Sequence, residues 1–241
     1  MPGNIFKRYS QNNPVIDLMK EKTDAIDYAF RQAGVKSFAD LGGVWGVDGG
    51  YTFYALDNYS VEKCFLVDLF FTRNVQKKKK HLKQLNLIQG DFGSQDTIRQ
   101  IPELDTLFLF DVLLHQVDPD WQDILRMYST LARCFIIYNP QYVGSETVRL
   151  LDLGEEGYFE NVPHQRNEEP YVTIFKKPNE INPQTGEKYS DDKGIWQWGI
   201  VDEDLTGFLK ELGYDMIYFK NYGQWGSLIN FEGHAFIFQS H

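Results

Sequence analysis

Short apolar runs alternate with amphipathic segments along most of the chain, and this alternation predicts an α/β fold. Runs of strand length lie at 37–41, 63–67, 85–89, 105–111 and 134–138. The run at 105–111 is apolar on both faces, which is typical of a central parallel strand. Because helical segments separate the runs, we expect a mostly parallel sheet with helices on both faces.

An amphipathic helix is expected before the first strand, over residues 14–33. Its apolar residues recur near one face, at Val15, Met19, Ile26 and Phe30. Gly34 suits the end of this helix, because glycine tolerates the left-handed backbone found at helix C-termini. Residues 1–36 should therefore form an N-terminal helical extension. A later helix should begin at Asp118-Pro119, with the aspartate as N-cap and the proline in the first turn.

The alternation breaks at residues 141–200, a polar stretch that is rich in aromatic residues and contains four prolines. We expect an inserted cap here, because long irregular inserts are commonly binding loops or lids. Order resumes with a helix at 202–212 and strands at 215–220 and 235–239. Since no long helix separates these two strands, they should pair antiparallel and complete a single domain of 241 residues.

A glycine cluster at the end of the first strand is the most informative local feature. The segment reads Asp40-Leu41-Gly42-Gly43-Val44-Trp45-Gly46, and the second strand ends in Asp68. Glycines let the backbone approach a ligand closely, and an acid after the next strand accepts hydrogen bonds from ribose hydroxyls. The order strand, glycine turn, helix, strand and acid predicts a nucleoside-cofactor site.

These residues and two later segments resemble the motifs of class I S-adenosylmethionine-dependent methyltransferases. Asp40 to Gly46 is similar to the acid-and-glycine motif of that family, and Asp68 stands where its ribose-binding acid stands. Asp91-Phe92 is similar to the pair that contacts adenine. The segment Asp111 to His115 is similar to the one that lines the methionine end. The resemblance covers about 37–140, and 200–241 by topology.

The resemblance implies a Rossmann-like, seven-stranded, mostly parallel sheet with an antiparallel last strand, and S-adenosylmethionine as cofactor. The implied cofactor contacts come from Asp40, Gly42, Gly43, Gly46, Asp68, Leu69, Asp91, Phe92, Asp111 and Val112. The family's middle glycine is Val44 here, so its side chain must point away from the cofactor or the loop must bulge. The expected reaction is methyl transfer to a small-molecule acceptor, aided by orientation and desolvation.

His115 is the candidate general base. It stands just after the fourth strand, at the carboxyl edge where α/β sheets bind ligands. The ordinary histidine pKa of about 6.5 suits a base that takes a hydroxyl proton as the methyl group arrives. A hydroxyl oxygen is therefore the expected acceptor atom. The alternative is a histidine that only hydrogen-bonds backbone or cofactor; His164 and His234 are weaker candidates.

Aromatic residues in and after the insert are candidate walls for an acceptor pocket. They are Tyr158, Phe159, Tyr171, Phe175, Trp196, Trp198, Tyr222 and Trp225. Core packing is the alternative for each of them. Because their segments are expected to overhang the carboxyl edge, some of them should line the pocket.

Two other functions are open at this point. Gly43, Gly46 and Gly49 have the spacing of extended short-chain dehydrogenases, which would indicate an NAD(P)-dependent oxidoreductase or epimerase. Those enzymes also need a Tyr-x-x-x-Lys pair on a later helix. The pair found here, Tyr59 and Lys63, comes just before the second strand. The third possibility is a non-catalytic cofactor-binding subunit.

Two further patterns have structural interpretations. Asn139-Pro140-Gln141-Tyr142 resembles the Asn-Pro-Pro-Tyr motif of amino-methylating enzymes, but it follows the fifth strand rather than the fourth. We therefore expect a strand-ending turn there. The basic run Lys77–Lys80, with Lys83, is expected to be the solvated face of a helix rather than a phosphate or RNA site.

Composition narrows the expected partners. The formal net charge is -10, which argues against nucleic acid because no basic surface would release counterions. No apolar run approaches the ~20 residues of a membrane helix, and the N-terminus lacks a signal-peptide core, so we expect a cytoplasmic protein without a membrane partner. Cys64 and Cys134 should be buried free thiols. No residue spacing indicates a metal site, and the oligomeric state stays open.

Overall fold

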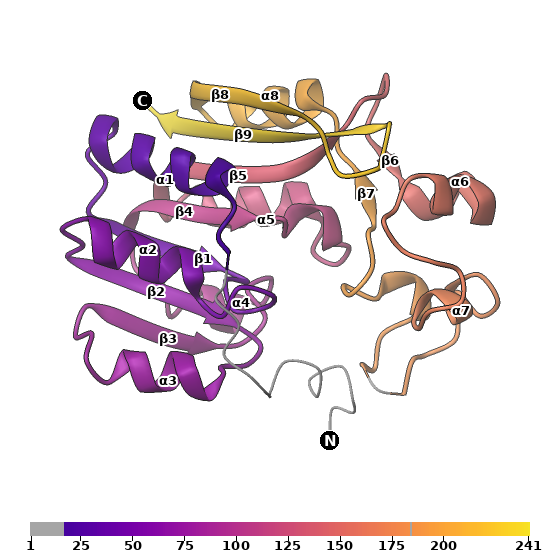
Figure 1. Cartoon of the computed structure of the whole chain (residues 1–241), viewed down its shortest axis with the longest axis horizontal. Coiled ribbons are helices and arrows are strands. Elements are labelled where there is room, and N and C mark those ends of the chain that lie inside the picture. The colour runs from indigo at the N-terminus through magenta and orange to yellow at the C-terminus, as the bar shows by residue number, and fades with distance from the viewer. Residues whose placement is uncertain (1–16, 184) are drawn as a thin grey trace.

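The computed structural model describes residues 17–183 and 185–241. Its core is a seven-stranded sheet in the order β3-β2-β1-β4-β5-β9-β8 (Figure 1). Its strands are β1 (Ser37–Leu41), β2 (Lys63–Asp68), β3 (Leu85–Gln89), β4 (Leu104–Phe110), β5 (Ala132–Tyr142), β8 (Tyr214–Gln224) and β9 (Phe231–Ser240). β9 pairs antiparallel with β5 and β8, and the other pairs are parallel. The predicted sheet is confirmed.

Helices cover both faces of this sheet, as the amphipathic pattern predicts. One face carries α1 (Lys20–Gln32), α2 (Gly50–Asn58) and α3 (Arg73–Lys79); the other carries α4 (Gln95–Ile98), α5 (Trp121–Tyr128) and α8 (Asp202–Glu211). Each face has its own apolar core. Phe38 stacks on Phe108 at 4.4 Å on the first face, and Trp121 meets Phe208 edge-on at 5.7 Å on the second. Each buried aromatic of this kind contributes about 1.5–3 kcal/mol by leaving water.

The N-terminal helix differs from its prediction in extent and in its buried face. Residues 14–16 of the predicted helix, Val15 among them, lie outside the described residues, and α1 begins only at Lys20. Gly34 follows the C-cap with φ +63°, as expected. The buried side chains are Lys22, Ala25, Ile26 and Ala29. The apolar pattern missed Lys22, because it scores a charged residue as exposed.

The predicted start of α5 is wrong by two residues. Asp120, not Asp118, is the N-cap, and its Oδ1 accepts a hydrogen bond from the backbone N of Asp123 at 2.9 Å. Val117 and Asp120 form an antiparallel bridge, so the residues between them make a turn and the helix cannot yet begin. Pro119 therefore lies before the helix rather than in its first turn.

The strand-ending turn expected at Asn139–Tyr142 is also wrong. β5 runs through these residues, paired antiparallel with β9, and places Pro140 opposite Gly233. β4 ends at Phe110, the partner of Tyr138, so beyond that point β5 has only one neighbour in the sheet. A proline there costs no ladder hydrogen bond, because its missing N–H would face the side that β4 has left.

Between β5 and α8 the chain leaves the carboxyl edge of the sheet and forms an insert, residues 143–200 (Figure 1). The insert contains β6 (Val148–Arg149), η3 (Leu150–Leu153), α6 (Gly154–Glu160), α7 (Tyr171–Ile174), η4 (Tyr189–Asp191) and β7 (Trp198–Gly199). β6 and β7 form a separate two-stranded sheet. The buried aromatic residues of the insert pack together with Phe231 of β9, so the insert has its own apolar core.

A buried histidine ties β9 to the start of α8. His234 Nδ1 lies 2.9 Å from Asp202 Oδ1, and its Nε2 lies 3.1 Å from Glu232 Oε2. Burial by itself lowers the pKa of His234, but the two carboxylates outweigh this effect and raise the pKa above its ordinary value. The imidazolium form is therefore favoured in the folded state.

This arrangement predicts a pH-dependent contribution to stability. It is fully present below the unfolded histidine pKa of about 6.5, and it is lost as the pH rises through the raised pKa of the folded state. His234→Gln should remove that dependence. Urea unfolding of both proteins from pH 5.5 to 9, values chosen to span this window, measures it. Parallel plots of unfolding free energy against pH would contradict the assignment.

Candidate functional site

The candidate cofactor residues gather at the carboxyl edge of the sheet. Asp40 is near the end of β1, Asp68 ends β2, and Asp111 follows β4. Because these strands are parallel, their carboxyl ends meet at one edge (Figure 1). A Cβ placed on Gly42 would lie 2.9 Å from Val112 Cγ1 and 3.6 Å from the ring of Phe92, so the structure brings three predicted segments together.

The turn after β1 has a backbone that strongly favours glycine. Gly42 and Gly46 have φ of +73° and +77°, and a Cβ on Gly43 would lie 2.4 Å from the carboxyl carbon of Asp40. Val44 replaces the family's middle glycine, and its side chain is buried in the core on the α2 face. The neighbouring Trp45 is 57% exposed. The bulkier residue is thus accommodated on the core side of the turn.

Asp68 braces this turn. Its Oδ2 accepts hydrogen bonds from the backbone N of Val44 at 2.9 Å and of Trp45 at 3.3 Å. Burial raises the pKa of Asp68, and the backbone N–H groups it binds offset only part of that shift. Sequence reasoning predicted a ribose contact for Asp68, which stays a prediction; the structure shows that Asp68 positions the turn. Leu69, the next residue, is exposed.

Asp40 lies directly beneath Gly43 and is almost fully buried. Thr52 Oγ1 donates a hydrogen bond to Asp40 Oδ2 at 2.7 Å. Burial nevertheless raises the pKa of Asp40 to about 7, and the nearby carboxylate of Asp68 adds to the rise. The two acids therefore differ: Asp68 faces the backbone of the turn, and Asp40 supports the turn from inside the core.

Sequence reasoning missed Lys22. This lysine of α1 is only 4% exposed, and its ammonium group forms an ion pair with Asp111. It lies 5.2 Å from the ring of Tyr51 and 5.1 Å from that of Tyr138. Asp111 has φ +56°, and its Oδ1 is buried without a hydrogen-bond partner among the described residues. Helical spacing from Lys22 to Ala25 and Ala29 was the available signal.

The insert reaches the candidate adenine segment through one ion pair. Lys193 Nζ lies 2.7 Å from Asp91 Oδ2, and the backbone N of Gly93 donates to Asp91 Oδ1 at 2.8 Å. Tyr128 of α5 donates a hydrogen bond to the carbonyl of Phe92 at 2.8 Å. Asp91 and Phe92 are therefore held from both sides, by the insert and by the sheet domain.

His115 ends the short helix η2 (Leu113–His115), between the sheet and the insert. Its Nδ1 lies 2.7 Å from the carbonyl oxygen of Ile195. A carbonyl only accepts, so Nδ1 carries the proton and Nε2 of the neutral ring keeps its lone pair. Burial lowers the pKa of His115. The neutral ring at physiological pH is therefore a competent proton acceptor.

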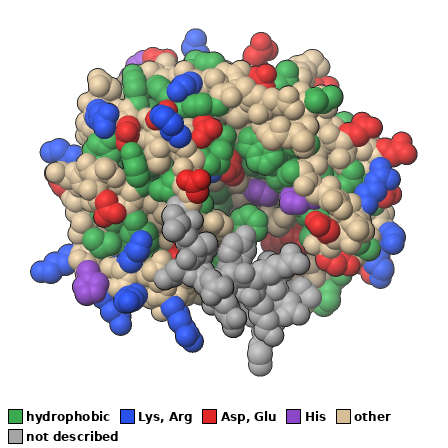
Figure 2. Space-filling model, viewed as in Figure 1, with side chains coloured by type: hydrophobic (Ala, Val, Ile, Leu, Met, Phe, Trp, Pro, Cys, Tyr) green, Lys and Arg blue, Asp and Glu red, His purple; other side chains and the backbone are tan. Residues whose placement is uncertain are grey.

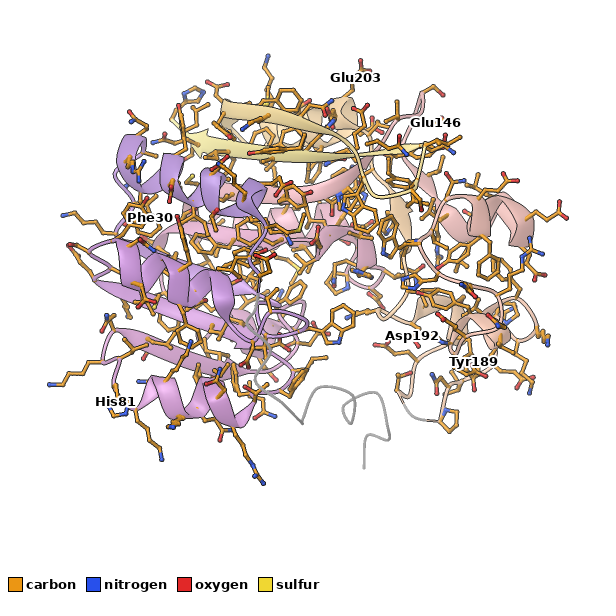
Figure 3. The ribbon with its side chains drawn as sticks, in the orientation of Figure 1. Phe30, His81, Glu146, Tyr189, Asp192 and Glu203 are labelled. Atoms are coloured by element: carbon orange, nitrogen blue, oxygen red, sulfur yellow. The ribbon has the colours of Figure 1, made fainter. Side chains whose placement is uncertain are left out.

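Figure 2 shows a hollow in this face of the molecule where histidine and hydrophobic side chains gather. Asp192 lies on the side of the insert that faces the sheet (Figure 3), and its Oδ1 accepts a hydrogen bond from the backbone N of Gly194 at 2.8 Å. His164 stacks on Tyr171 at 4.6 Å, and burial lowers the pKa of this second histidine.

The predicted aromatic walls divide into three groups. Core packing, the alternative interpretation, holds for Tyr158, Tyr171 and Trp196, which are buried in the core of the insert, and for Phe159 and Phe175, which pack against it. Tyr222 and Trp225 line a cavity of about 250 Å³ between the β8–β9 hairpin and the start of α1. Trp198 belongs to neither group, because it lines a different cavity, between α5 and α8.

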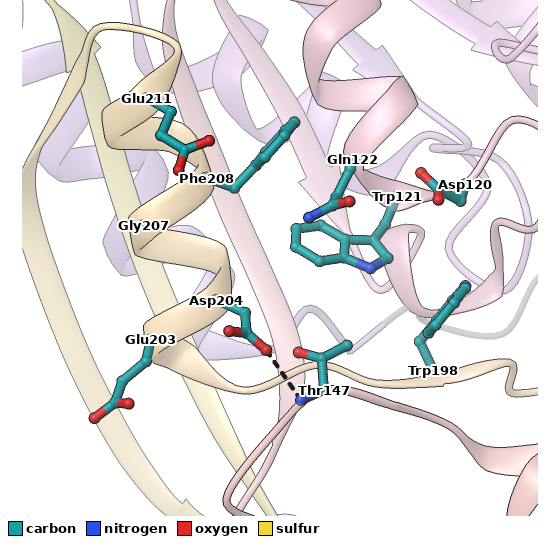
Figure 4. A pocket seen from close by; sticks show the side chains of 10 residues that line it. All are labelled: Asp120, Trp121, Gln122, Thr147, Trp198, Glu203, Asp204, Gly207, Phe208 and Glu211. Carbon is teal, nitrogen blue, oxygen red and sulfur yellow. Dashed lines mark hydrogen bonds between the residues drawn. The ribbon is translucent and has the colours of Figure 1, made fainter.

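A second cavity, of about 430 Å³, lies between α5 and α8 (Figure 4). Trp121, Trp198 and Phe208 form its aromatic walls, and the carboxylate of Asp204 at its margin accepts a hydrogen bond from the backbone N of Thr147 at 3.0 Å. None of the candidate cofactor residues lines it.

The Tyr-x-x-x-Lys pair of the NAD(P)-dependent alternative does not lie near the glycine turn. The Tyr59 hydroxyl donates to Asp27 at 2.6 Å, and Lys63 is the first residue of β2, so both lie at the opposite edge of the sheet from the glycine turn. The Lys77–Lys80 run is mostly exposed, as predicted. Cys64 and Cys134 are buried free thiols. The described residues hold no cluster suited to a metal ion and no helix able to cross a membrane.

The raised pKa of Asp40 predicts that this carboxylate destabilises the fold at neutral pH. Between the unfolded pKa of about 4 and the folded value of about 7 the native state binds more protons, so stability falls by up to ~1.4 kcal/mol per pH unit. Asp40→Asn keeps an acceptor for Thr52 and should abolish that fall. Denaturant unfolding from pH 4 to 8 measures it. A variant that is less stable than wild type at pH 8 would contradict this account.

No protein-family model matches the chain, and no curated protein matches it in sequence. Solved structures do match in fold. The 1,6-didemethyltoxoflavin-N1-methyltransferase of Burkholderia thailandensis, with 1,6-didemethyltoxoflavin and S-adenosylhomocysteine bound, superposes with TM-score 0.59 at 10% identity, over 92% of this chain and 78% of that one.

Two further structures show the same likeness. The N-terminal domain of EvdMO1, in the presence of S-adenosylhomocysteine and D-fucose, has TM-score 0.56 at 16% identity over 93% of this chain and 84% of that one. The small RNA methyltransferase HEN1 has TM-score 0.54 at 16% identity, over 96% of this chain but 27% of that one. The chain therefore has the Rossmann-like fold of class I S-adenosylmethionine-dependent methyltransferases.

Proposed function

We propose that this protein is an S-adenosylmethionine-dependent methyltransferase that acts on a hydroxyl oxygen of a small molecule. The observation that carries the proposal is the glycine turn, which has no room for a side chain at Gly43. Asp68 holds the turn by accepting a hydrogen bond from the backbone N of Val44, and Val112 lies close to Gly42. A turn of this kind lets a ligand contact the backbone directly, because no side chain stands between them. The fold neighbours crystallised with S-adenosylhomocysteine support the choice of cofactor.

The residues present fit this cofactor. Asp68 and Leu69 would hold the ribose, and Asp91 with Phe92 the adenine. Asp111 Oδ1 is a buried acceptor without a described partner, as expected for a group that receives the methionine ammonium. An orphaned buried acceptor costs about 1–3 kcal/mol until a ligand satisfies it. Gly42, Gly43, Gly46 and Val112 supply the close backbone surface.

His115 is the proposed general base. S-adenosylmethionine, when bound, supplies the activated methyl group. Nε2 of His115 takes the hydroxyl proton, and the carbonyl of Ile195 stabilises the resulting imidazolium through Nδ1. The insert is the proposed cap, which excludes water from this hollow. The net charge of -10 favours a small neutral acceptor over RNA.

Cofactor binding is testable without an acceptor. Asp68→Asn should weaken S-adenosylhomocysteine binding by about 1.5–3 kcal/mol, the usual loss for a charged hydrogen-bond partner. Gly42→Ala should weaken it further, because a Cβ there approaches Val112 at 2.9 Å. Calorimetric titration measures both affinities.

Asp96→Asn is the matched control, because Asp96 is a highly exposed carboxylate of α4 whose side chain pairs with Arg99 and with none of the proposed cofactor residues. It should leave the affinity unchanged. A protein that is stabilised against heat by NAD but not by S-adenosylhomocysteine would overturn the cofactor assignment.

Turnover should depend on His115. His115→Ala should lower the rate of S-adenosylhomocysteine formation by about 10²–10⁴, measured over a panel of hydroxylated small molecules. His115→Asn should be equally slow although its amide can keep the bond to Ile195. In wild type the rate should rise with pH and then level off. The midpoint of the rise should lie below the ordinary histidine pKa of about 6.5, because burial lowers the pKa of His115.

Cofactor affinity should change little in both His115 variants, which separates catalysis from binding. If His115→Asn retains wild-type turnover, the histidine is structural and the transfer proceeds by proximity alone.

A further inference from the structure

The cavity between the β8–β9 hairpin and the start of α1 is here called the hairpin pocket. The turn of that hairpin lies at the same edge of the sheet as the carboxyl ends of the parallel strands (Figure 1). It holds about 250 Å³, room for one or two fused rings. Its side walls are the side chains of Met19, Tyr138, Tyr222 and Trp225. The rest of the lining comes from Glu21, Gln224 and three glycines, 223, 226 and 233, which have no side chain to occupy the space between the rings.

Tyr138 gives this pocket a polar group without a partner. The residue is only 2% exposed, and its hydroxyl has no hydrogen bond to any described residue. The hydroxyl lies against Gly233, where an added Cβ would stand 2.6 Å from it and 3.7 Å from Trp225 Cδ1. Buried hydroxyls normally find a partner, so this one is available to a ligand.

The pocket adjoins the reaction centre through two contacts. The carbonyl of Tyr138 accepts a hydrogen bond from the backbone N of Asp111 at 2.9 Å. Trp225 packs on Trp196 at 5.1 Å, and Trp196 follows Ile195, whose carbonyl holds His115. Two lining residues of the pocket, Tyr138 and Trp225, are therefore each linked by a contact to the segments of the proposed methionine end and the proposed base.

The charges around the pocket favour a neutral ligand over a cation. Lys22 lies 5.1 Å from the ring of Tyr138, and Lys220 lies 4.4 Å from the ring of Tyr222. A ring that already attracts one cation gains less from a second, because the two cations repel. Glu21 at the pocket margin also disfavours an anion. Planar walls and little net charge suit an aromatic ring.

We propose that the hairpin pocket binds the aromatic ring of a phenolic methyl acceptor, and that the Tyr138 hydroxyl hydrogen-bonds a polar substituent of that ring. This inference rests on the proposed methyltransferase function, which it deepens by naming the acceptor class. Tyr138 is a binding residue in this scheme, and His115 remains the base.

Calorimetric titration with 2-naphthol, on protein saturated with S-adenosylhomocysteine, tests the pocket. Decahydro-2-naphthol has the same hydroxyl on a saturated ring system and should bind at least about fivefold more weakly. Tyr138→Phe removes one oxygen from the pocket and should weaken 2-naphthol binding about 3- to 10-fold. It should leave the affinity for naphthalene, which has no hydroxyl, unchanged.

Tyr142→Phe is the matched control, because Tyr142 lies on the same strand but packs against Phe231 in the insert core. It should bind 2-naphthol like wild type. Equal affinities for the aromatic and saturated alcohols, or an unchanged 2-naphthol affinity in Tyr138→Phe, would overturn the inference. Failure of S-adenosylhomocysteine to bind, with Tyr138-dependent binding of 2-naphthol intact, would instead overturn the proposed function.

Discussion

The close packing of the glycine turn on two buried acids is the constraint on which the rest of the site depends. Asp68 binds the backbone N–H groups of the turn from one side, and Asp40 fills the space beneath Gly43 from the other. No residue with a Cβ fits at Gly43 without displacing Asp40. The turn is thereby fixed in the one shape that leaves its backbone open to a ligand.

Burying Asp40 and Asp68 side by side disfavours their charged forms, and a neighbouring lysine reduces this effect at Asp40. Two carboxylates with raised pKa lie close together at the ends of β1 and β2. The buried ammonium of Lys22 lowers the pKa of Asp40 and pairs with Asp111 at the end of β4. Helix α1 therefore has a role beyond covering the sheet, because it delivers a positive charge to the edge where acids accumulate.

Segments distant in sequence reach this edge and contact residues of the sheet domain there. The insert brings Ile195 to His115 and Lys193 to Asp91, while the β8–β9 hairpin brings Trp225 towards Tyr138. Each contact joins a surface loop to a strand end of the sheet. The sheet edge that holds the candidate cofactor residues is thus surrounded by loops, and loops carried on a rigid sheet can vary without altering the sheet.

The sequence by itself determined the strands, their mostly parallel direction, the antiparallel closing pair and the glycine-and-acid signature. These follow from local periodicity and from backbone limits on single residues. It placed the α5 cap two residues early and took Asn139–Tyr142 for a turn, because a turn bridge and a missing neighbouring strand are not local properties. Only the tertiary structure decided that Lys22 is buried, that Asp68 braces the turn, and that Tyr138 and Trp225 share a pocket. These facts depend on contacts between residues far apart in the chain, which no periodic pattern records.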